Sequence, residues 1–171
     1  MIFNYWTDGA ATMRKDENGN YIRETGGWAF ALIDENNKEI QFSTSGGELQ
    51  TTNQRMELEA IRRSLNHYMI HYITEKCSDT INIYSDSAYC INIFTQWIKG
   101  WVAKGWRRGK NQPIENLDLI QDIWATIRGI EDNTFSTVNF IKVKGHSGEK
   151  DWNDYVNKLA VETKLKIRSQ E

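Results

Sequence analysis

The order of apolar and polar positions along the chain predicts three strands first and strand–helix alternation afterwards. Residues 2–6 alternate apolar and polar side chains, as a half-buried strand does, and run into Asp8. Residues 27–33 and 38–45 predict two more strands, with a polar hairpin connection at 34–37. The stretch 11–25 is polar and contains Asn18-Gly19, a turn signal. The first three strands are therefore expected to form an antiparallel meander.

A long amphipathic helix follows the meander, and either Thr51 or Thr52 can cap its start. Its apolar face is marked by residues three and four positions apart: Leu58, Ile61, Leu65, Tyr68 and Tyr72. Residues 80–84 predict a fourth strand that ends at Asp86, and residues 87–97 predict another helix. Residues 137–143 predict a fifth strand.

Two further helices complete the expected fold. Their inward positions are Leu117, Ile120, Trp124 and Ile127 in one, and Trp152, Val156, Leu159 and Thr163 in the other. A meander followed by strand–helix alternation predicts an α/β fold in which helices flank a five-stranded mixed sheet, antiparallel first and then parallel. We find no internal repeat and no linker, so residues 1–171 are expected to form a single domain.

Composition narrows the class of protein only slightly. Hydrophobic residues make up 39% of the 171 residues and charged residues 26%, and the net charge of −2 excludes a uniformly basic nucleic-acid binder. The sequence shows no signal peptide and no apolar run long enough to span a membrane. Two cysteines, Cys77 and Cys90, are too few for a disulfide framework, so we expect small apolar side chains in a cytoplasmic protein.

Three carboxylates are the candidate chemistry. Asp8 and Asp86 each end a predicted strand, and Glu57 falls in the first turns of the long helix. Ligands of open α/β sheets gather beyond the strand ends, and a helix start packed there would bring the three acids together. Clustered acids repel one another unless cations neutralise them, and hard divalent ions prefer oxygen ligands. Taken alone, an Asp at a strand end is usually a turn former or a helix cap, and Glu57 could simply be a first-turn acid that offsets the helix dipole.

The residues around these acids resemble the motifs of type 1 ribonuclease H. The strings TDG at 7–9, TTNQRMEL at 51–58, SDS at 85–87 and KGHSG at 144–148 occur in order, and the resemblance extends from residue 5 to about residue 160. It implies a ribonuclease H-like fold and an endoribonuclease that cleaves the RNA strand of RNA–DNA hybrids. The family uses two-metal-ion hydrolysis, which leaves 5′-phosphate and 3′-hydroxyl ends.

The same resemblance implies the cofactor, the partner and the roles of the site residues. Asp8, Glu57 and Asp86 would hold two Mg²⁺ ions when substrate is bound, and Mn²⁺ could replace Mg²⁺. His146 matches the family's mobile-loop histidine, which moves a proton or assists product release; a lone loop histidine is otherwise an ordinary surface residue. The expected partner is an RNA–DNA hybrid duplex bound by a monomer, with no membrane involved.

One position departs from the family pattern. Asn157 stands where the family usually has a fourth acid, at the start of the last helix, and an amide carries no formal charge to attract a cation. The asparagine is either an introduced substitution that traps a substrate complex, a natural ligand through its carbonyl oxygen, or replaced in function by Asp154. Asp154 lies three residues before Asn157 and is turned from it by about 60° around the helix, which makes a full replacement awkward but possible. A solvated helix residue without function is a further interpretation.

Two rival functions are considered. With Asn157 as a sign of lost activity, the chain could be a catalytically silenced hybrid-binding form, but the retention of the other three acids and of His146 argues against this. The second rival is another nuclease of the same fold that acts on DNA, which would be expected to lack a basic loop beside a Gly-His-Ser-Gly segment.

Residues 97–110 hold five cations, three tryptophans and no acid. Cations contact phosphates and aromatic faces pack on sugars or bases, although a solvated loop over packed tryptophans would show the same composition. The stretch resembles the basic protrusion with which many type 1 ribonucleases H hold the DNA strand. Its candidate contact residues are Trp97, Lys99, Trp101, Lys104, Trp106, Arg107, Arg108 and Lys110.

Four polar side chains complete the expected hybrid interface. Thr52 and Asn116 resemble the family's pocket for a DNA phosphate, which Gln50 weakens because some members carry arginine there. Asn53 and Gln54 carry amides that suit recognition of the RNA 2′-hydroxyl, although Asn53 could instead cap the helix. A further contact is expected to be missing at Ala88, where close bacterial relatives have a larger polar residue.

Overall fold

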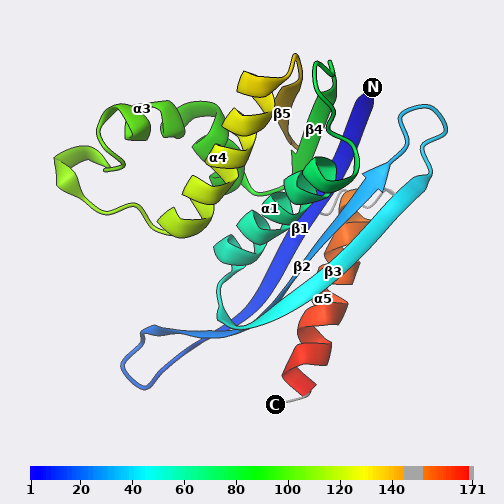
Figure 1. Ribbon diagram of the computed structural model, residues 1–171. Helices are drawn as coiled ribbons and strands as arrows, with labels where there is room; N and C mark the ends of the chain where they lie inside the picture. The colour runs from blue at the N-terminus through cyan, green and yellow to red at the C-terminus, as the bar shows by residue number, and fades with distance from the viewer. Residues whose placement is uncertain (145–151, 170–171) are drawn as a thin grey trace.

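Five strands form one mixed sheet in the order β3-β2-β1-β4-β5 (Figure 1). The computed structural model describes residues 1–144 and 152–169. Antiparallel pairing joins β1 to β2 and β2 to β3, whereas β4 pairs in parallel with both β1 and β5. This is the mixed sheet that the sequence predicted. The strands are β1 Ile2–Lys15, β2 Tyr21–Ile33, β3 Ile40–Thr51, β4 Thr80–Ser85 and β5 Thr137–Lys142.

Helices cover the two faces of the sheet. On one face α1 packs on β1 and β2 and against α4, and on the other face α5 packs on β1, β2 and β3 (Figure 1). Alternate residues of β2 serve the two faces: Phe30 and Leu32 join the core under α1, and Ala29 and Ala31 pack under α5. The helices are α1 Asn53–His71, α2 Ala88–Asn92, α3 Ile98–Ala103, α4 Leu117–Asn133 and α5 Trp152–Ser169, with a π turn η1 at Ile93–Trp97 and a 3₁₀ turn η2 at Gly109–Asn111.

The first two strands are longer than predicted, so Asp8 lies inside β1 and the prediction that it ends a strand is wrong. Pairing of β1 with β2 continues to Lys15↔Tyr21, and the hairpin turns where Gly19 adopts φ 81°. Residues 11–15 and 21–25 form strand arms, and only residues 16–20, which contain the predicted turn at Asn18-Gly19, form the connection. Main-chain pairing holds these arms without the alternating apolar side chains by which a strand is recognised in a sequence.

Halfway along its length β1 loses its parallel neighbour. The last β1–β4 pair is Trp6↔Tyr84, and β4 ends at Ser85. Two residues beyond that pair on each strand stand Asp8 and Asp86. Parallel register therefore places the two acids side by side where β1 becomes an open edge of the sheet.

Helix α1 begins with a side-chain cap and approaches β1 closely. Thr52 is the N-cap, and its hydroxyl accepts a hydrogen bond from the Arg55 N–H, which decides between the two threonines that the sequence allowed. A Cβ on Gly9 would lie 2.3 Å from the main-chain carbon of Met56 and 2.4 Å from the main-chain nitrogen of Glu57. Only glycine allows this approach. The close packing of α1 on β1 places Glu57 next to the β1 edge.

The helix predicted for residues 87–97 continues further than expected. It consists of α2 and the π turn and passes directly into α3, which occupies the first part of the predicted loop. Ile98 anchors this segment because it is 1% exposed, and the chain leaves α3 through Gly105 and Trp106, both with positive φ. The tryptophan-rich stretch is therefore a helical protrusion beyond α4 (Figure 1).

Two further expectations concern the cysteines and membranes. Cys90 is buried and Cys77 is half-buried, and both are free thiols. Within residues 1–144 and 152–169, no helix has the length and apolar character needed to cross a bilayer.

Replacing Gly9 with alanine tests the close approach of α1. Gly9→Ala should lower the free energy of unfolding by about 1–3 kcal/mol, because the new Cβ meets main-chain atoms that cannot rotate away. Gly129→Ala on α4 is the matched control, since its Cβ meets nothing within 4 Å, and alanine there should raise stability by up to about 1 kcal/mol. Urea titrations of both variants measure the difference; an unchanged Gly9→Ala midpoint would contradict the packing.

Candidate active site

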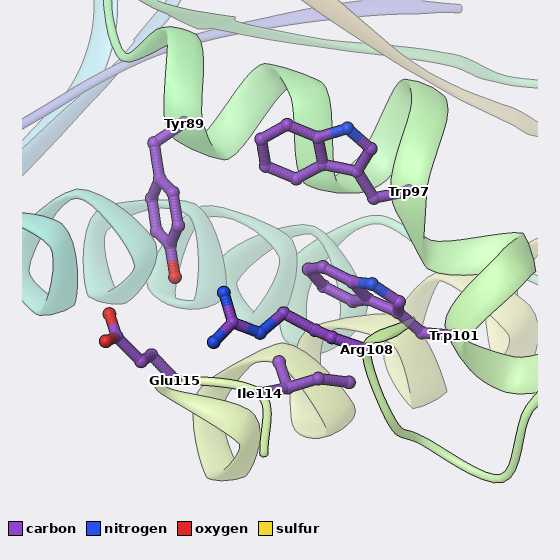
Figure 2. A pocket seen from close by; sticks show the side chains of 6 residues that line it. All are labelled: Tyr89, Trp97, Trp101, Arg108, Ile114 and Glu115. Carbon is purple, nitrogen blue, oxygen red and sulfur yellow. The ribbon is translucent and has the colours of Figure 1, made fainter. Parts of the chain in front are cut away.

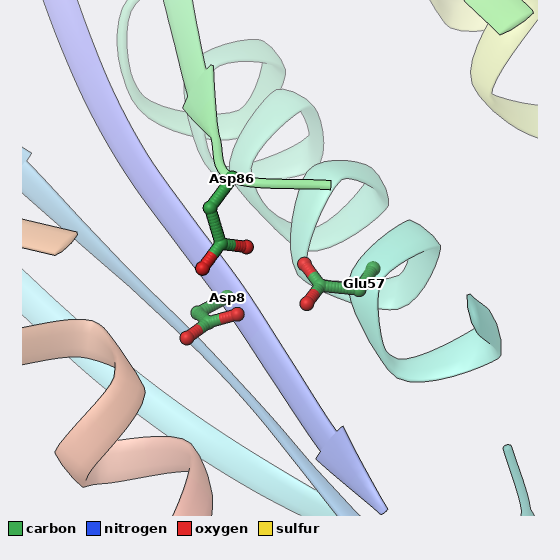
Figure 3. A group of neighbouring side chains, drawn as sticks. All are labelled: Asp8, Glu57 and Asp86. Atoms are coloured by element: carbon green, nitrogen blue, oxygen red, sulfur yellow. The ribbon is translucent and has the colours of Figure 1, made fainter. Parts of the chain in front are cut away.

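Three carboxylates from three different elements meet at the open edge of β1 (Figure 3). Asp8 comes from β1, Asp86 from the segment directly after β4, and Glu57 from the second turn of α1. One oxygen of each lies within 4.8 Å of the other two. Asp8 is 1% exposed, and Glu57 and Asp86 are half-buried. The structure thus brings together the acids that the sequence singled out.

The cluster is electrostatically strained. Burial raises the pKa of Glu57 well above its ordinary value, and the negative charges of Asp8 and Asp86 raise it further. A hydrogen bond from the Gly9 N–H acts in the opposite direction. The Oε2 atom of Glu57 is buried and has no hydrogen-bond partner in the described part of the chain.

These residues fit a divalent cation. Carboxylate oxygens are the ligands that hard cations prefer, and a cation would both offset the repulsion and satisfy the orphaned Glu57 oxygen. Without one, the buried oxygen has no compensating interaction for its lost hydration.

Two amides of α5 face the carboxylates. Asn157 donates from Nδ2 to Oδ2 of Asp8 at 2.8 Å, so it lies at the site and is not a solvated helix residue. Asn153, one turn earlier, is 2% exposed; its Nδ2 lies 3.5 Å from Oδ2 of Asp86, and its Oδ1 has no partner among the described atoms. Asp154 is not a member of the acid group in the described residues.

Asn153 is a site residue that the sequence analysis missed. The signal was available in its spacing, because residues four apart on a helix lie on one face and Asn157 was already a candidate. An asparagine at a polar helix start carries no charge, however, and it gave no chemical reason to be selected.

A groove of about 530 Å³ runs along the open edge of β1 beside the acids. Ala10 and Ala11 lie on its β1 side, and Asn53 and Gln54 line it from the start of α1. The Asn53 Oδ1 accepts the edge N–H of Ala11 at 2.6 Å, so this amide does not cap the helix.

A second polar cluster surrounds the start of α1. Asn116 donates from Nδ2 to the Tyr89 hydroxyl at 3.0 Å and approaches Oε1 of Gln54 at 3.4 Å. Arg55 binds Asp118 through two hydrogen bonds, at 3.0 and 2.8 Å, and this pairing lowers the pKa of Asp118 to about 2. Thr52 and Asn116, the expected phosphate-pocket pair, thus flank the same helix end, near its positive dipole.

The two positions expected to weaken binding are both exposed. Gln50 has a positive φ of 55°, and Ala88 is the first residue of α2.

The protrusion carries a second hollow, of about 320 Å³ (Figure 2). Trp97 is 40% exposed and lies 6.0 Å from Trp101, centroid to centroid, whereas Trp101 and Trp106 pack against the core. Arg108 lines the hollow and donates to the Pro113 carbonyl at 3.0 Å. The cations are exposed and form no ion pair with described residues: Lys99, Lys104, Arg107, Arg108 and Lys110.

His146, the candidate proton carrier, falls in residues 145–151, outside the described residues. Its proposed role stays a prediction from the sequence.

Comparison with known proteins shows the family to which this chain belongs. The family model RNase H matches residues 2–164. A Ribonuclease H of Lachnoclostridium phytofermentans is 38% identical over 149 residues, covering 86% of this chain and 83% of the relative. Another, of Caldanaerobacter subterraneus, is 37% identical over 162 residues, covering 94% of this chain and 90% of the relative.

Solved structures show the same fold. LC9-RNase H1, described as a type 1 RNase H with the type 2 active-site motif, superposes with a TM-score of 0.72 at 24% identity and covers 95% of this chain and 72% of its own. LC11-RNase H1, solved in complex with an RNA/DNA hybrid, gives 0.60 at 19% identity and covers 96% of this chain and 98% of its own. The fold is therefore the ribonuclease H-like fold that the sequence predicted. The chain belongs to the type 1 ribonuclease H family, which makes it a hydrolase.

Glu57→Gln tests whether the cluster is strained without a cation. Because the pKa of Glu57 is raised on folding, ionising it destabilises the folded state, and in chelator the wild-type protein should lose stability as the pH rises from the ordinary carboxyl range through that raised value. Glu57→Gln should remove this loss and raise the thermal midpoint in chelator at pH 8. Saturation with Mg²⁺ to ten times its Kd should stabilise wild type by about 1.4 kcal/mol and the variant by much less.

Glu162→Gln on the exposed side of α5 is the control and should show the wild-type response to both pH and Mg²⁺. A Glu57→Gln protein that is less stable than wild type in chelator and still gains from Mg²⁺ would show that the cluster is not strained.

Proposed function

We propose that this protein is an endonuclease that hydrolyses the RNA strand of RNA–DNA hybrids with two divalent cations, Mg²⁺ or Mn²⁺, and leaves 5′-phosphate and 3′-hydroxyl ends. The observation that carries the proposal is the acid cluster at the β1 edge, with its orphaned Glu57 oxygen. The family supports it, as does the similarity to LC11-RNase H1, which binds an RNA/DNA hybrid.

Asp8, Glu57 and Asp86 would hold the cations, with Asn157 as a fourth, neutral contact. Bound divalent ions supply an activated water and neutralise charge on the scissile phosphate. Asn157 now presents its NH₂ to Asp8; half a turn of the terminal torsion would present its oxygen instead. Because the amide is neutral, it attracts a cation less strongly than the usual acid.

The remaining residues would bind and orient the duplex. Asn53 and Gln54 line the groove beside the acids, where their amides would contact RNA 2′-hydroxyls. Thr52 and Asn116 would hold a DNA phosphate, and the exposed cations of the protrusion would hold the DNA strand further along. His146 would hold or release a proton beside the cleaved bond, by resemblance to the family. We expect a single-domain monomer that acts in the cytoplasm.

A panel of labelled duplexes tests this function. With Mg²⁺, the protein should cleave the RNA strand of an RNA–DNA hybrid and leave duplex RNA and duplex DNA intact, because both the 2′-hydroxyl and the DNA strand are read. Chelator should abolish the activity and Mn²⁺ should restore it. Cleavage of duplex DNA would favour another nuclease of the fold, and tight hybrid binding without cleavage would favour a silenced binding form.

Asn157→Asp separates the interpretations of the fourth position. A fourth negative charge should strengthen the attraction for the cation and lower the Mg²⁺ concentration for half-maximal cleavage by about tenfold or more. Asp154→Asn, three residues away, is the matched variant and should behave as wild type. If Asp154→Asn instead abolishes cleavage while Asn157→Asp changes nothing, Asp154 supplies the fourth ligand.

A further inference from the structure

The groove beside the acids contains a cation that the proposed chemistry does not use. Lys164 of α5 lines this groove and is the one cation among its described lining residues, which otherwise carry the acids, amides and small side chains. It is half-buried, and it forms no ion pair with any residue in the described ranges. A half-buried lysine that has no ion-pair partner among the described residues is a group with which an anionic ligand could pair.

Close packing fixes the position from which Lys164 extends. A Cβ on Gly27 of β2 would lie 2.2 Å from the Ala160 carbonyl oxygen and 2.9 Å from the Lys164 main-chain nitrogen, so α5 rests directly on the sheet there. One residue earlier, Thr163 donates to the Ser45 hydroxyl of β3 at 2.7 Å. The backbone of Lys164 is thus held rigidly, and only its side chain is free to adjust.

The helix also relates Lys164 to the acids. Lys164 lies seven positions after Asn157, which contacts Asp8, so the two positions lie on one face of α5 and about 10 Å apart along its axis. Along a nucleic-acid strand, that distance corresponds to a few nucleotides. If the scissile phosphate lies at the acids, Lys164 would therefore be near a phosphate a few nucleotides away. A lysine ammonium is a compact charge that pairs with a phosphate without demanding a fixed orientation.

The lining of the groove indicates which strand of the hybrid would carry the phosphate near Lys164. Helices α1 and α5 cover opposite faces of the sheet, so Asn53 and Gln54 on one side and Lys164 on the other enclose the same groove along the β1 edge. The protrusion that carries the other cations lies beyond α4, away from α5 (Figure 1). A strand in the groove is therefore the one whose 2′-hydroxyls the amides contact, namely the RNA.

We propose that Lys164 is a positioning residue that binds a backbone phosphate of the RNA strand a few nucleotides from the cleaved bond. This inference rests on the proposed function, and it adds a contact on α5 to the contacts already assigned to α1 and the protrusion.

Steady-state kinetics of Lys164→Ala test the contact. KM for the hybrid should rise three- to tenfold with kcat nearly unchanged, and the plot of log(kcat/KM) against log salt should become shallower by about one unit, as expected when one phosphate contact is lost. Lys164→Arg should keep most of the affinity. Lys158→Ala, on the same helix but 77% exposed and outside the groove, is the control and should match wild type. Unchanged KM and salt slope in Lys164→Ala would overturn the proposal.

Single methylphosphonate linkages identify the strand, because each removes the charge of one phosphate. At one RNA position the neutral linkage should weaken binding of the hybrid by the wild-type protein, but it should not weaken binding by Lys164→Ala any further. The same result at a DNA linkage, or additive losses at every RNA linkage, would overturn the assignment.

Equilibrium binding in chelator separates this inference from the proposed function. If wild type binds the hybrid in chelator but does not cleave it when Mg²⁺ is supplied, and Lys164→Ala binds more weakly in chelator, the phosphate contact of Lys164 is confirmed and the catalytic proposal fails. If wild type cleaves and Lys164→Ala binds equally well, the catalytic proposal stands and the inference about Lys164 fails. Thermal unfolding of each variant shows that it is folded.

Discussion

Repulsion among Asp8, Glu57 and Asp86 is the constraint that the rest of the structure satisfies. Three carboxylates within 4.8 Å, one of them with an orphaned buried oxygen, would separate if their supports were loose. They are held because each is attached to a rigid element: Asp8 to a strand paired with β2, Asp86 to the end of a central strand, and Glu57 to a helix whose neighbouring Met56 and Leu58 are fully buried. Core packing therefore maintains a site that its own charges oppose.

The early end of β4 makes this arrangement possible. A strand in the middle of a sheet is covered by helices on both faces and by neighbours on both sides, which leaves no room for a ligand. Once β4 stops at Ser85, β1 has one free side, and side chains from α1 on one face and α5 on the other reach around it. Gly9 and Gly27 contribute by letting the two helices approach the sheet more closely than any side chain would permit.

Most of the fold could be predicted from the sequence, and the failures have physical causes. The apolar faces of α1, α4 and α5 and the parallel strands are signalled by burial, which leaves periodic apolar residues in a sequence. The hairpin arms that extend β1 and β2 are held by main-chain hydrogen bonds, which leave no such mark, so the apolar pattern predicts a strand end at Asp8. The consequence for the site was small, because the β1–β4 pairing does end just before Asp8.

Some residues of the candidate site could likewise be predicted from the sequence, and others could not. Asp8, Glu57 and Asp86 could be selected from the sequence because of their places at predicted strand ends and a helix start, and because their flanking residues resemble the motifs of the family. Asn153 and Lys164 could not, since an asparagine or a lysine on a polar helix is usual. Only the folded structure shows that Asn153 faces Asp86 and that Lys164 lines the groove.

The distribution of charge explains how a chain of net charge −2 can attract a polyanion to an acidic site. The cations of the protrusion, which form no ion pair with the described residues, lie on one side of the acids and Lys164 on the other, so a duplex that contacts both would cross the carboxylates. Phosphates are attracted to the two flanks within a Debye length of about 8 Å at physiological salt, whereas the acids themselves repel them. Under the proposed function, the scissile phosphate would settle beside the acids only once divalent cations reverse the sign of the potential at the cluster. Correct placement of that phosphate, as well as its hydrolysis, would then depend on the metal.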